Sequence, residues 1–312
     1  MNVRVFFAAP PRMWPAWRGP LERALAAAGV EAVLSAEAPD PAAVDYIVFA
    51  PGGVIEDFRP YTSARAVLNL WAGVEAIVGN ETLTQPLCRM VDPGLTEGMV
   101  DYVAAHVLRH HVGLDAHILG QDGVWRHAAV PPLARDRHVA VLGLGALGRA
   151  AAEALRGLGF AVEGWARSAR DLDGIVTHAG ADGLAALLPR AEIVVLLLPH
   201  TSETENLLDA RRLALLPRGA VIVNPGRGAL IDDAALLDAL DRGHIGHATL
   251  DVFRTEPLPP AHPFWAHPGV TVTPHIASET RPETSAPVIA ENIRRGEAGE
   301  PFLHLVDRAR GY

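Results

Sequence analysis

Lysine is missing from this chain, in which all 27 basic residues are arginine. Without lysine, neither Schiff-base chemistry nor the phosphate-binding lysine of a P-loop is available. Cysteine is almost missing as well, because Cys88 is the one thiol and has no partner for an internal disulfide. A single cysteine is typical of a reducing compartment, and we interpret Cys88 as a core thiol.

Long apolar runs are also absent: the longest, Ile193–Pro199, is much shorter than a membrane span. The N-terminal Val3–Ala8 lacks the charged start and cleavage site of a signal peptide, so we interpret it as a strand. The net charge of −9 and the scattered arginines exclude a basic stripe for nucleic acid. We therefore expect a cytoplasmic protein with no membrane and no nucleic-acid partner.

The most informative stretch is Val139–Gly159. A short apolar run leads into three glycines, and an alanine-rich helical pattern follows. Gly143 lets the turn close, Gly145 removes a side chain that would block a pyrophosphate, and Gly148 lets the helix pack closely on the strand. The free N–H groups of the helix then face the phosphates, which predicts a dinucleotide site. Its expected residues are Gly143, Gly145, Ala146, Leu147 and Gly148.

The end of the next strand indicates which dinucleotide binds. NAD-binding domains have an acidic residue about 20 positions after the glycines, where it holds the ribose 2′-hydroxyl. Here Ala166 and Arg167 occupy that place. A carboxylate would repel a 2′-phosphate, whereas Arg167, Ser168 and Arg170 suit one. The sequence therefore predicts a preference for NADP(H), with NAD(H) as the alternative.

Three further loops follow apolar strands of the same predicted sheet. They are the turn Asn224–Gly228 with Arg227, the segment Leu250–Pro257 with Asp251 and Glu256, and the segment Thr273–Ala277 with His275. The carboxyl ends of parallel strands meet at one edge, where the nicotinamide would lie. Carbonyl reduction needs an arginine to polarise the ketone, a histidine to protonate the alkoxide and a glutamate to orient the imidazole.

These motifs resemble those of the D-2-hydroxyacid dehydrogenase family, in particular its bacterial glyoxylate/hydroxypyruvate reductase A group. The glycine turn, the N-x-x-R-G turn, the D-V-F-x-x-E-P-L-P segment and the T-P-H-I-A strand end carry the resemblance. It extends to Arg89–Asp92, Thr280–Glu283 and Val306–Tyr312, and thus covers the chain from about Leu70 onward.

The resemblance implies NADPH-dependent reduction of a small 2-keto acid, of the glyoxylate or hydroxypyruvate type, to the D-2-hydroxy acid. Arg227, Glu256 and His275 would be the catalytic set, with His275 as the proton donor. The remaining implied contacts are the main-chain N–H groups of Ala72, Gly73 and Val74 to the substrate carboxylate, Asp251 to the nicotinamide carboxamide, and Pro199, His200 and Thr201 to the adenosine side.

For the architecture, alternating strands and helices predict an α/β protein with two doubly wound parallel-sheet domains. The first helix is expected over Pro20–Gly29. The sheet that begins with the glycine turn is expected to have six strands, over Val139–Leu142, Ala161–Trp165, Ile193–Leu198, Ala220–Val223, Ala248–Leu250 and Val270–Val272. Residues 1–96 plus 280–312 are expected to form a flavodoxin-like, substrate-binding domain, and residues 97–279 a larger Rossmann domain that binds NAD(P). A long helical period over Thr96–Gln121, followed by Gly120–Pro132, suits an arm of a homodimer.

His106 and His110 have the i, i+4 spacing of metal ligands, but the sequence offers no third ligand, so we expect packed histidines and no metal.

Two alternative functions remain open. A non-catalytic dinucleotide sensor or corepressor on the same fold, or another D-2-hydroxyacid specificity, would preserve the glycine turn. The absence of lysine argues against short-chain and β-hydroxyacid dehydrogenases, which depend on a catalytic lysine.

Overall fold

The computed structural model describes residues 2–125 and 130–312. They divide into two compact units, one from the N-terminus to Leu95 together with Glu279–Tyr312, and one formed by Thr96–Ser278. These limits differ by one residue from the expected domain boundaries. The predicted roles of the two domains are taken up below as part of the proposed function.

The first unit contains a five-stranded parallel sheet with the order β2-β1-β3-β4-β5. This is the order of flavodoxin-like folds. The strands are β1 (Val3–Ala8), β2 (Ala32–Ser35), β3 (Tyr46–Phe49), β4 (Ala66–Asn69) and β5 (Leu87–Cys88). The helices of this unit are α1 (Trp14–Ala27), α2 (Glu75–Val78) and α9 (Pro282–Glu297).

Strand β1 shows how the sheet is buried on both faces. Val5 and Phe7 pack in the core cluster beneath α1 and α9, whereas Phe6 and Ala8 pack in the cluster on the opposite face. Helix α1 begins before the expected start at Pro20, because Trp17 is buried against Phe7 and anchors an earlier turn. Cys88 is buried, as interpreted, and burial raises the pKa of its thiol to about 12.

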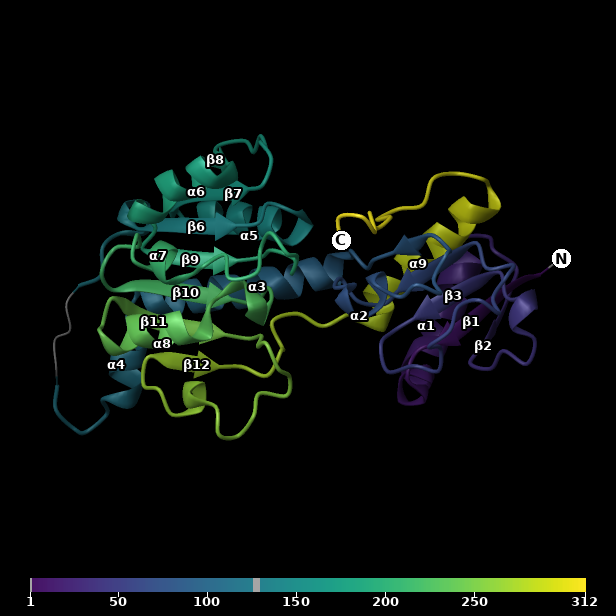
Figure 1. The fold of residues 1–312 in the computed structure, drawn as a ribbon, viewed down its shortest axis with the longest axis horizontal. Helices are drawn as coiled ribbons and strands as arrows, with labels where there is room; N and C mark the ends of the chain where they lie inside the picture. Colours follow the sequence, from purple (N-terminus) through teal and green to yellow (C-terminus); the bar gives the residue numbers. More distant parts are fainter. Residues whose placement is uncertain (1, 126–129) are drawn as a thin grey trace. The chain divides into compact units, whose positions relative to one another are not determined.

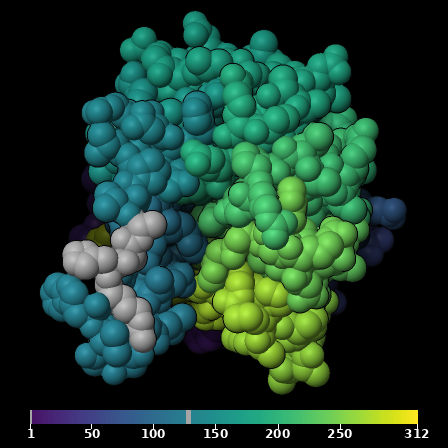
Figure 2. Space-filling view, turned by 90° about the vertical axis from the view of Figure 1, so that its left-hand side faces the viewer, coloured from purple at the N-terminus to yellow at the C-terminus, as the bar shows by residue number. Residues whose placement is uncertain are grey.

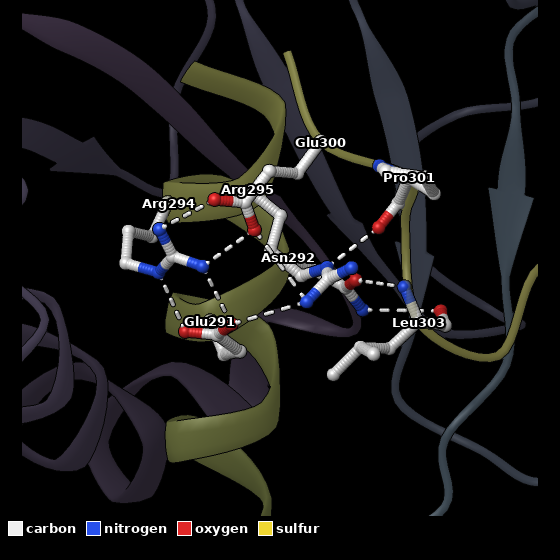
Figure 3. A network of polar contacts seen from close by, with 7 residues as sticks. All are labelled: Glu291, Asn292, Arg294, Arg295, Glu300, Pro301 and Leu303. Carbon is white, nitrogen blue, oxygen red and sulfur yellow. Dashed lines mark hydrogen bonds and ion pairs between the residues drawn. The ribbon is translucent and has the colours of Figure 1, made fainter. Parts of the chain in front are cut away.

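A polar network fixes the C-terminal tail to α9 (Figure 3). Arg294 forms ion pairs with Glu291 and Glu300, with an N–O distance of 2.8 Å in each. The buried Asn292 accepts a hydrogen bond from the Leu303 N–H at 2.7 Å. Because Glu300 and Leu303 follow the helix, these contacts hold the chain as it leaves α9.

The second unit contains a seven-stranded parallel sheet with the order β12-β11-β10-β9-β6-β7-β8, visible side by side in Figure 1. Counted within this unit, β6 to β11 have the order 3-2-1-4-5-6 of a Rossmann fold. The strands are β6 (His138–Leu142), β7 (Ala161–Ala166), β8 (Val176–Ala179), β9 (Ile193–Leu196), β10 (Ala220–Asn224), β11 (Ile245–Leu250) and β12 (Val270–Val272). The helices within it are α4 (Leu114–Leu119), α5 (Ala146–Gly157), α6 (Gly180–Leu187), α7 (Ala210–Leu213) and α8 (Asp233–Asp241), while α3 (Pro93–His111) starts in the first unit.

Helices cover both faces of this sheet. Alternate residues of β6 separate the two cores: Val139 and Val141 pack with α3 and α5, whereas Ala140 and Leu142 pack with α6 and α8. Burial on both faces explains why the strands are nearly continuous apolar runs. The expected fold class is confirmed. The sheet has one strand more than the six expected, because the sequence reasoning missed β8, which is short and half polar.

The expected long helix over Thr96–Gln121 is wrong in detail. The one predicted helix is two helices, α3 and α4, because Gly113 has φ +69° and ends the first of them. The segment expected to follow it, Gly120–Pro132, includes residues 126–129, which lie outside the described residues. No helix in the described part of the chain is both long and apolar enough to span a bilayer.

Candidate active site

The glycine turn lies between β6 and α5, at the point where the strand order reverses. Gly143 has φ +108°, and a Cβ atom there would lie 2.4 Å from the Leu197 carbonyl oxygen. A Cβ on Gly148 would lie 1.7 Å from the Gly143 carbonyl oxygen. Both positions therefore require glycine for close packing of the turn, the helix and the loop after β9.

Gly145 differs from these two glycines. It caps α5, and a Cβ built on it would meet no atom within 4 Å. The first N–H groups of α5, on Ala146 and Leu147, have no partner earlier in the helix and lie directly after this residue. Open space beside free N–H groups and the positive end of a helix dipole fits a pyrophosphate, so these residues can hold the expected dinucleotide.

The residues expected to bind the 2′-phosphate of the ribose directly follow β7. Arg167, Ser168 and Arg170 are all exposed directly after the strand. Arg167 Nη1 donates to Glu203 Oε2 at 2.8 Å, so a carboxylate from the loop after β9 lies beside the predicted phosphate ligand. The sequence does not reveal Glu203, because 36 positions separate it from Arg167 and no local motif marks it.

The expected adenosine-side residues Pro199, His200 and Thr201 lie in this same loop after β9. Thr204 determines its shape: its hydroxyl donates to the Pro199 carbonyl oxygen at 2.7 Å and accepts from the Thr201 N–H at 2.8 Å. His200 is exposed. The loop therefore presents these residues beside the glycine turn, whose Gly143 approaches Leu197.

The turn that carries Arg227 is organised by Asn224, the last residue of β10. Its buried side chain accepts from the Gly226 N–H at 3.1 Å and donates to the Arg227 carbonyl oxygen at 2.9 Å. A Cβ on Gly228 would lie 2.1 Å from the Phe253 carbonyl carbon, so this turn packs directly on the loop after β11. The sequence signal for Asn224 is its place in the N-x-x-R turn. That spacing alone does not show that the Asn224 side chain is buried and holds the turn.

Glu256 and His275 form a close pair. Glu256 Oε2 lies 2.7 Å from His275 Nδ1, and the other carboxylate oxygen accepts from the Phe253 N–H at 2.9 Å. Both side chains remain accessible, with 51% of the histidine and 36% of the glutamate exposed. Since Nδ1 is occupied, Nε2 is the nitrogen left to exchange a proton with a reactant.

Asp251 holds the histidine loop in place. Its buried carboxylate accepts from the Thr273 hydroxyl at 2.6 Å and from the N–H groups of Ile276 and Ala277, each at 2.9 Å. Its carbonyl oxygen accepts from the His275 N–H at 2.8 Å. His275 has φ +55°, a conformation that non-glycine residues rarely adopt and that these contacts stabilise.

The residues expected to bind the substrate carboxylate, Ala72, Gly73 and Val74, belong to the first unit. Buried Asn69, at the end of β4, donates to the carbonyl oxygens of Trp71 at 2.8 Å and Gly73 at 2.9 Å. These two hydrogen bonds fix the course of the loop. Whether its N–H groups bind a carboxylate stays a prediction.

The histidines of α3 pack against neighbouring side chains, as expected. The His106 ring lies 4.4 Å from that of Tyr102, and His110 Nε2 lies 2.9 Å from the Thr249 hydroxyl. Burial lowers the pKa of His110 to about 3, with neighbouring His247 contributing in the same direction. No group of three potential metal-binding side chains occurs among the residues that the structure describes.

The sheet order, the glycine turn and the accessible Glu256–His275 pair define the class of a nicotinamide-dependent oxidoreductase. The comparisons with known proteins specify the family. The profile of "D-isomer specific 2-hydroxyacid dehydrogenase, NAD binding domain" matches residues 103–277. The chain belongs to the D-isomer specific 2-hydroxyacid dehydrogenase family.

Individual relatives agree with this membership. A protein named glyoxylate/hydroxypyruvate reductase A from Serratia proteamaculans is 41% identical over 257 residues, which are 80% of this chain and 82% of that protein. A 2-hydroxyacid dehydrogenase from Xanthobacter autotrophicus, solved with NADPH and MES, is 40% identical with a TM-score of 0.92 over the whole of both chains. An NADPH-dependent glyoxylate/hydroxypyruvate reductase from Sinorhizobium meliloti, solved with NADP and sulfate, is 34% identical with a TM-score of 0.88 over the same coverage.

Proposed function

We propose that this protein reduces a small 2-keto acid, of the glyoxylate or hydroxypyruvate type, to the D-2-hydroxy acid with NADPH. The observation that carries the proposal is the accessible Glu256–His275 pair, joined at 2.7 Å on the sheet edge that also holds the glycine turn. The names of the Serratia and Sinorhizobium relatives support this substrate class and this cofactor.

Each catalytic residue has a distinct task in this reaction. The bound cofactor supplies a hydride to the carbonyl carbon of the keto acid. His275 gives a proton from Nε2 to the carbonyl oxygen, and Glu256 stabilises the imidazolium before that transfer. Arg227 polarises the same carbonyl group and binds the substrate carboxylate.

Binding divides between the two units in this proposal. The first acts as the substrate domain, in which the N–H groups of Ala72, Gly73 and Val74 hold the carboxylate. In the second, Arg167, Ser168 and Arg170 bind the 2′-phosphate of NADPH, and NAD(H) is the weaker alternative. Asp251 has the additional task of contacting the nicotinamide carboxamide, and Pro199, His200 and Thr201 line the adenosine.

A homodimer and a cytoplasmic location complete the proposal. The residues of α4 and those just after it, blue at the margin of the face in Figure 2, expose large apolar side chains. Ile118 is 60% exposed, Leu119 84% and Trp125 90%, which is unusual for a surface that stays in water. A buried, unpaired Cys88 suits a reducing compartment.

The dimer is tested by placing a charge on this surface. We expect Leu119→Asp to shift the chain from dimer to monomer in light scattering, because a buried carboxylate without a partner opposes association. Val33→Asp, at an exposed apolar position of β2, is the control and should leave the mass unchanged. A wild-type monomer at assay concentrations contradicts the dimer.

The activity is tested by following the absorbance of NADPH with glyoxylate, hydroxypyruvate and phenylpyruvate. We expect turnover of at least one of these acids by the wild-type chain. His275→Ala should lower kcat by about 100-fold or more, because the proton donor is lost, while the Kd of NADPH changes little. His138→Ala, at the opposite end of β6, is the matched control and should retain kcat.

The same assay separates the proposal from its rivals. Tight binding of NADPH with no turnover of any 2-keto acid would favour a sensor or corepressor. Retention of most of kcat in His275→Ala would refute the role of that residue as the proton donor.

A further inference from the structure

A line of hydroxyl groups reaches Asp251 from α3. The Tyr102 hydroxyl oxygen lies 2.7 Å from Thr273 Oγ1, which lies 2.6 Å from Asp251 Oδ1. All three residues belong to the second unit, on α3, after β12 and after β11 respectively. The line thus joins α3 to the carboxylate that holds the His275 loop.

The direction of each hydrogen bond follows from the groups involved. The Thr273 hydroxyl donates its single proton to Asp251 Oδ1, so it can only accept from Tyr102. The Tyr102 hydroxyl must then donate to Thr273. Burial raises the pKa of Tyr102 to about 12, so this donor keeps its proton at neutral pH.

The line matters because the same Asp251 carboxylate that accepts from Thr273 also accepts from two backbone N–H groups of the His275 loop. Oδ1 accepts from both Thr273 and Ile276, while Oδ2 accepts from Ala277. Loss of the Thr273 bond leaves the carboxylate free to rotate away from these N–H groups. The loop that keeps His275 at φ +55° would then lose part of its support.

We propose that Tyr102 and Thr273 are positioning residues, which orient the Asp251 carboxylate and through it fix the imidazole of His275 for proton transfer. This inference deepens the proposed function and rests on it. Neither residue touches the reacting atoms in this scheme. Their effect is on the geometry of the proton donor, to which rates are highly sensitive.

The chain provides a matched control on the neighbouring strand. Thr249 in β11 is buried, and its hydroxyl lies 2.9 Å from Nε2 of His110, which is also on α3. Thr249→Val and Thr273→Val thus each remove one hydroxyl that meets a side chain of the same helix. Of these two threonines, Thr273 is the one that donates to the Asp251 carboxylate.

The experiment compares kcat, KM and the solvent deuterium isotope effect on kcat in the wild type and four variants. We expect Thr273→Val to lower kcat by about tenfold and Tyr102→Phe by about threefold, since a proton donor that is slightly misplaced transfers more slowly. The Kd of NADPH should change less than about twofold, and the isotope effect should rise as proton transfer becomes rate-limiting. Thr273→Ser, which keeps the hydroxyl, should restore kcat, whereas Thr249→Val should retain it.

Three results would overturn the inference. These are equal kcat in Thr273→Val and Thr249→Val, failure of Thr273→Ser to restore kcat, and an unchanged isotope effect in Tyr102→Phe. Tyr102→Phe removes only an oxygen atom and keeps the test open if Thr273→Val does not fold. Failure of the proposed function is a separate result, because the wild type would then reduce none of the 2-keto acids.

Discussion

At the scale of single residues, the predicted cofactor preference depends on one arginine. Arg167 stands where NAD-binding domains carry an acidic residue, and it forms an ion pair with Glu203 at 2.8 Å. Both side chains are substantially exposed, so the pair itself contributes little to stability. Its significance is that a 2′-phosphate would compete with Glu203 for the guanidinium.

We expect Arg167→Ala to raise the Kd of NADPH by about tenfold or more, because a charge-assisted hydrogen bond is lost. The Kd of NADH should stay nearly constant, since NADH has no 2′-phosphate. Glu203→Gln should have the opposite effect and lower the Kd of NADPH, because the carboxylate that competes with the 2′-phosphate for Arg167 is removed. Fluorescence titration with both cofactors measures these changes, and equal losses for NADPH and NADH in Arg167→Ala would contradict the role of this residue.

Arg156→Ala, at the far end of α5, is the control for removal of an exposed arginine. It should leave both dissociation constants unchanged. A loss of NADPH affinity in this variant would mean that general surface charge, rather than Arg167, governs binding.

At the scale of elements, two glycines of the β6–turn–α5 unit are required for different reasons. Gly148 is required by packing, since a Cβ there would lie 1.7 Å from a carbonyl oxygen. Gly145 borders open space and is required only if a ligand approaches. Substitution by alanine distinguishes the two.

We expect Gly148→Ala to lower Tm by several degrees and to abolish NADPH binding, because the turn and the helix must move apart. Gly145→Ala should keep the wild-type Tm while weakening NADPH by about tenfold or more, because its methyl group occupies the approach of the pyrophosphate. Gly157→Ala, in the last turn of the same helix and also in open space, is the control. It should bind NADPH normally and gain slightly in Tm. Thermal unfolding with and without NADPH checks all three, and undiminished binding by Gly145→Ala would exclude the turn as the phosphate site.

The elements also show how far the sequence could be interpreted. Apolar runs correctly located β6, β9, β10, β11 and β12, because buried parallel strands are continuous in hydrophobicity. The same reasoning missed β2 and β8, which have four residues each, and β5, which has two. Such strands are specified by hydrogen bonding to a neighbour, which leaves no periodic signal along the chain.

At the scale of the whole molecule, three partly buried histidines link stability to pH. Burial lowers the pKa of His106, His110 and His247, that of His110 to about 3. In the unfolded chain these side chains bind protons below about pH 6.5, whereas the folded chain resists protonation. The unfolded state therefore binds more protons in acid, and stability must fall as pH decreases from about 6.5 towards 3.

We expect the free energy of unfolding to fall by up to about 1.4 kcal/mol per pH unit for His110 over this range, with contributions of the same sign from His106 and His247. His110→Gln should reduce the slope by about one proton, since glutamine does not titrate. His117→Gln, at an exposed site of α4, should leave it unchanged. Denaturant unfolding at a series of pH values measures the slope, and an identical slope in His110→Gln and the wild type would contradict this account.

The sequence by itself determined the α/β class and the glycine turn, and it predicted Arg227, Glu256 and His275 at strand ends, because strand–loop–helix patterns and spacing are local features of the chain. Only the tertiary structure decided that α1 starts at Trp14 and that Gly113 divides the long helical period. It also decided which distant side chains meet: Glu203 lies beside Arg167, and Tyr102 and Thr273 lie in line with Asp251. Hydrogen bonds between segments far apart in sequence depend on how strands order themselves in the sheet, and no pattern along the chain records that order.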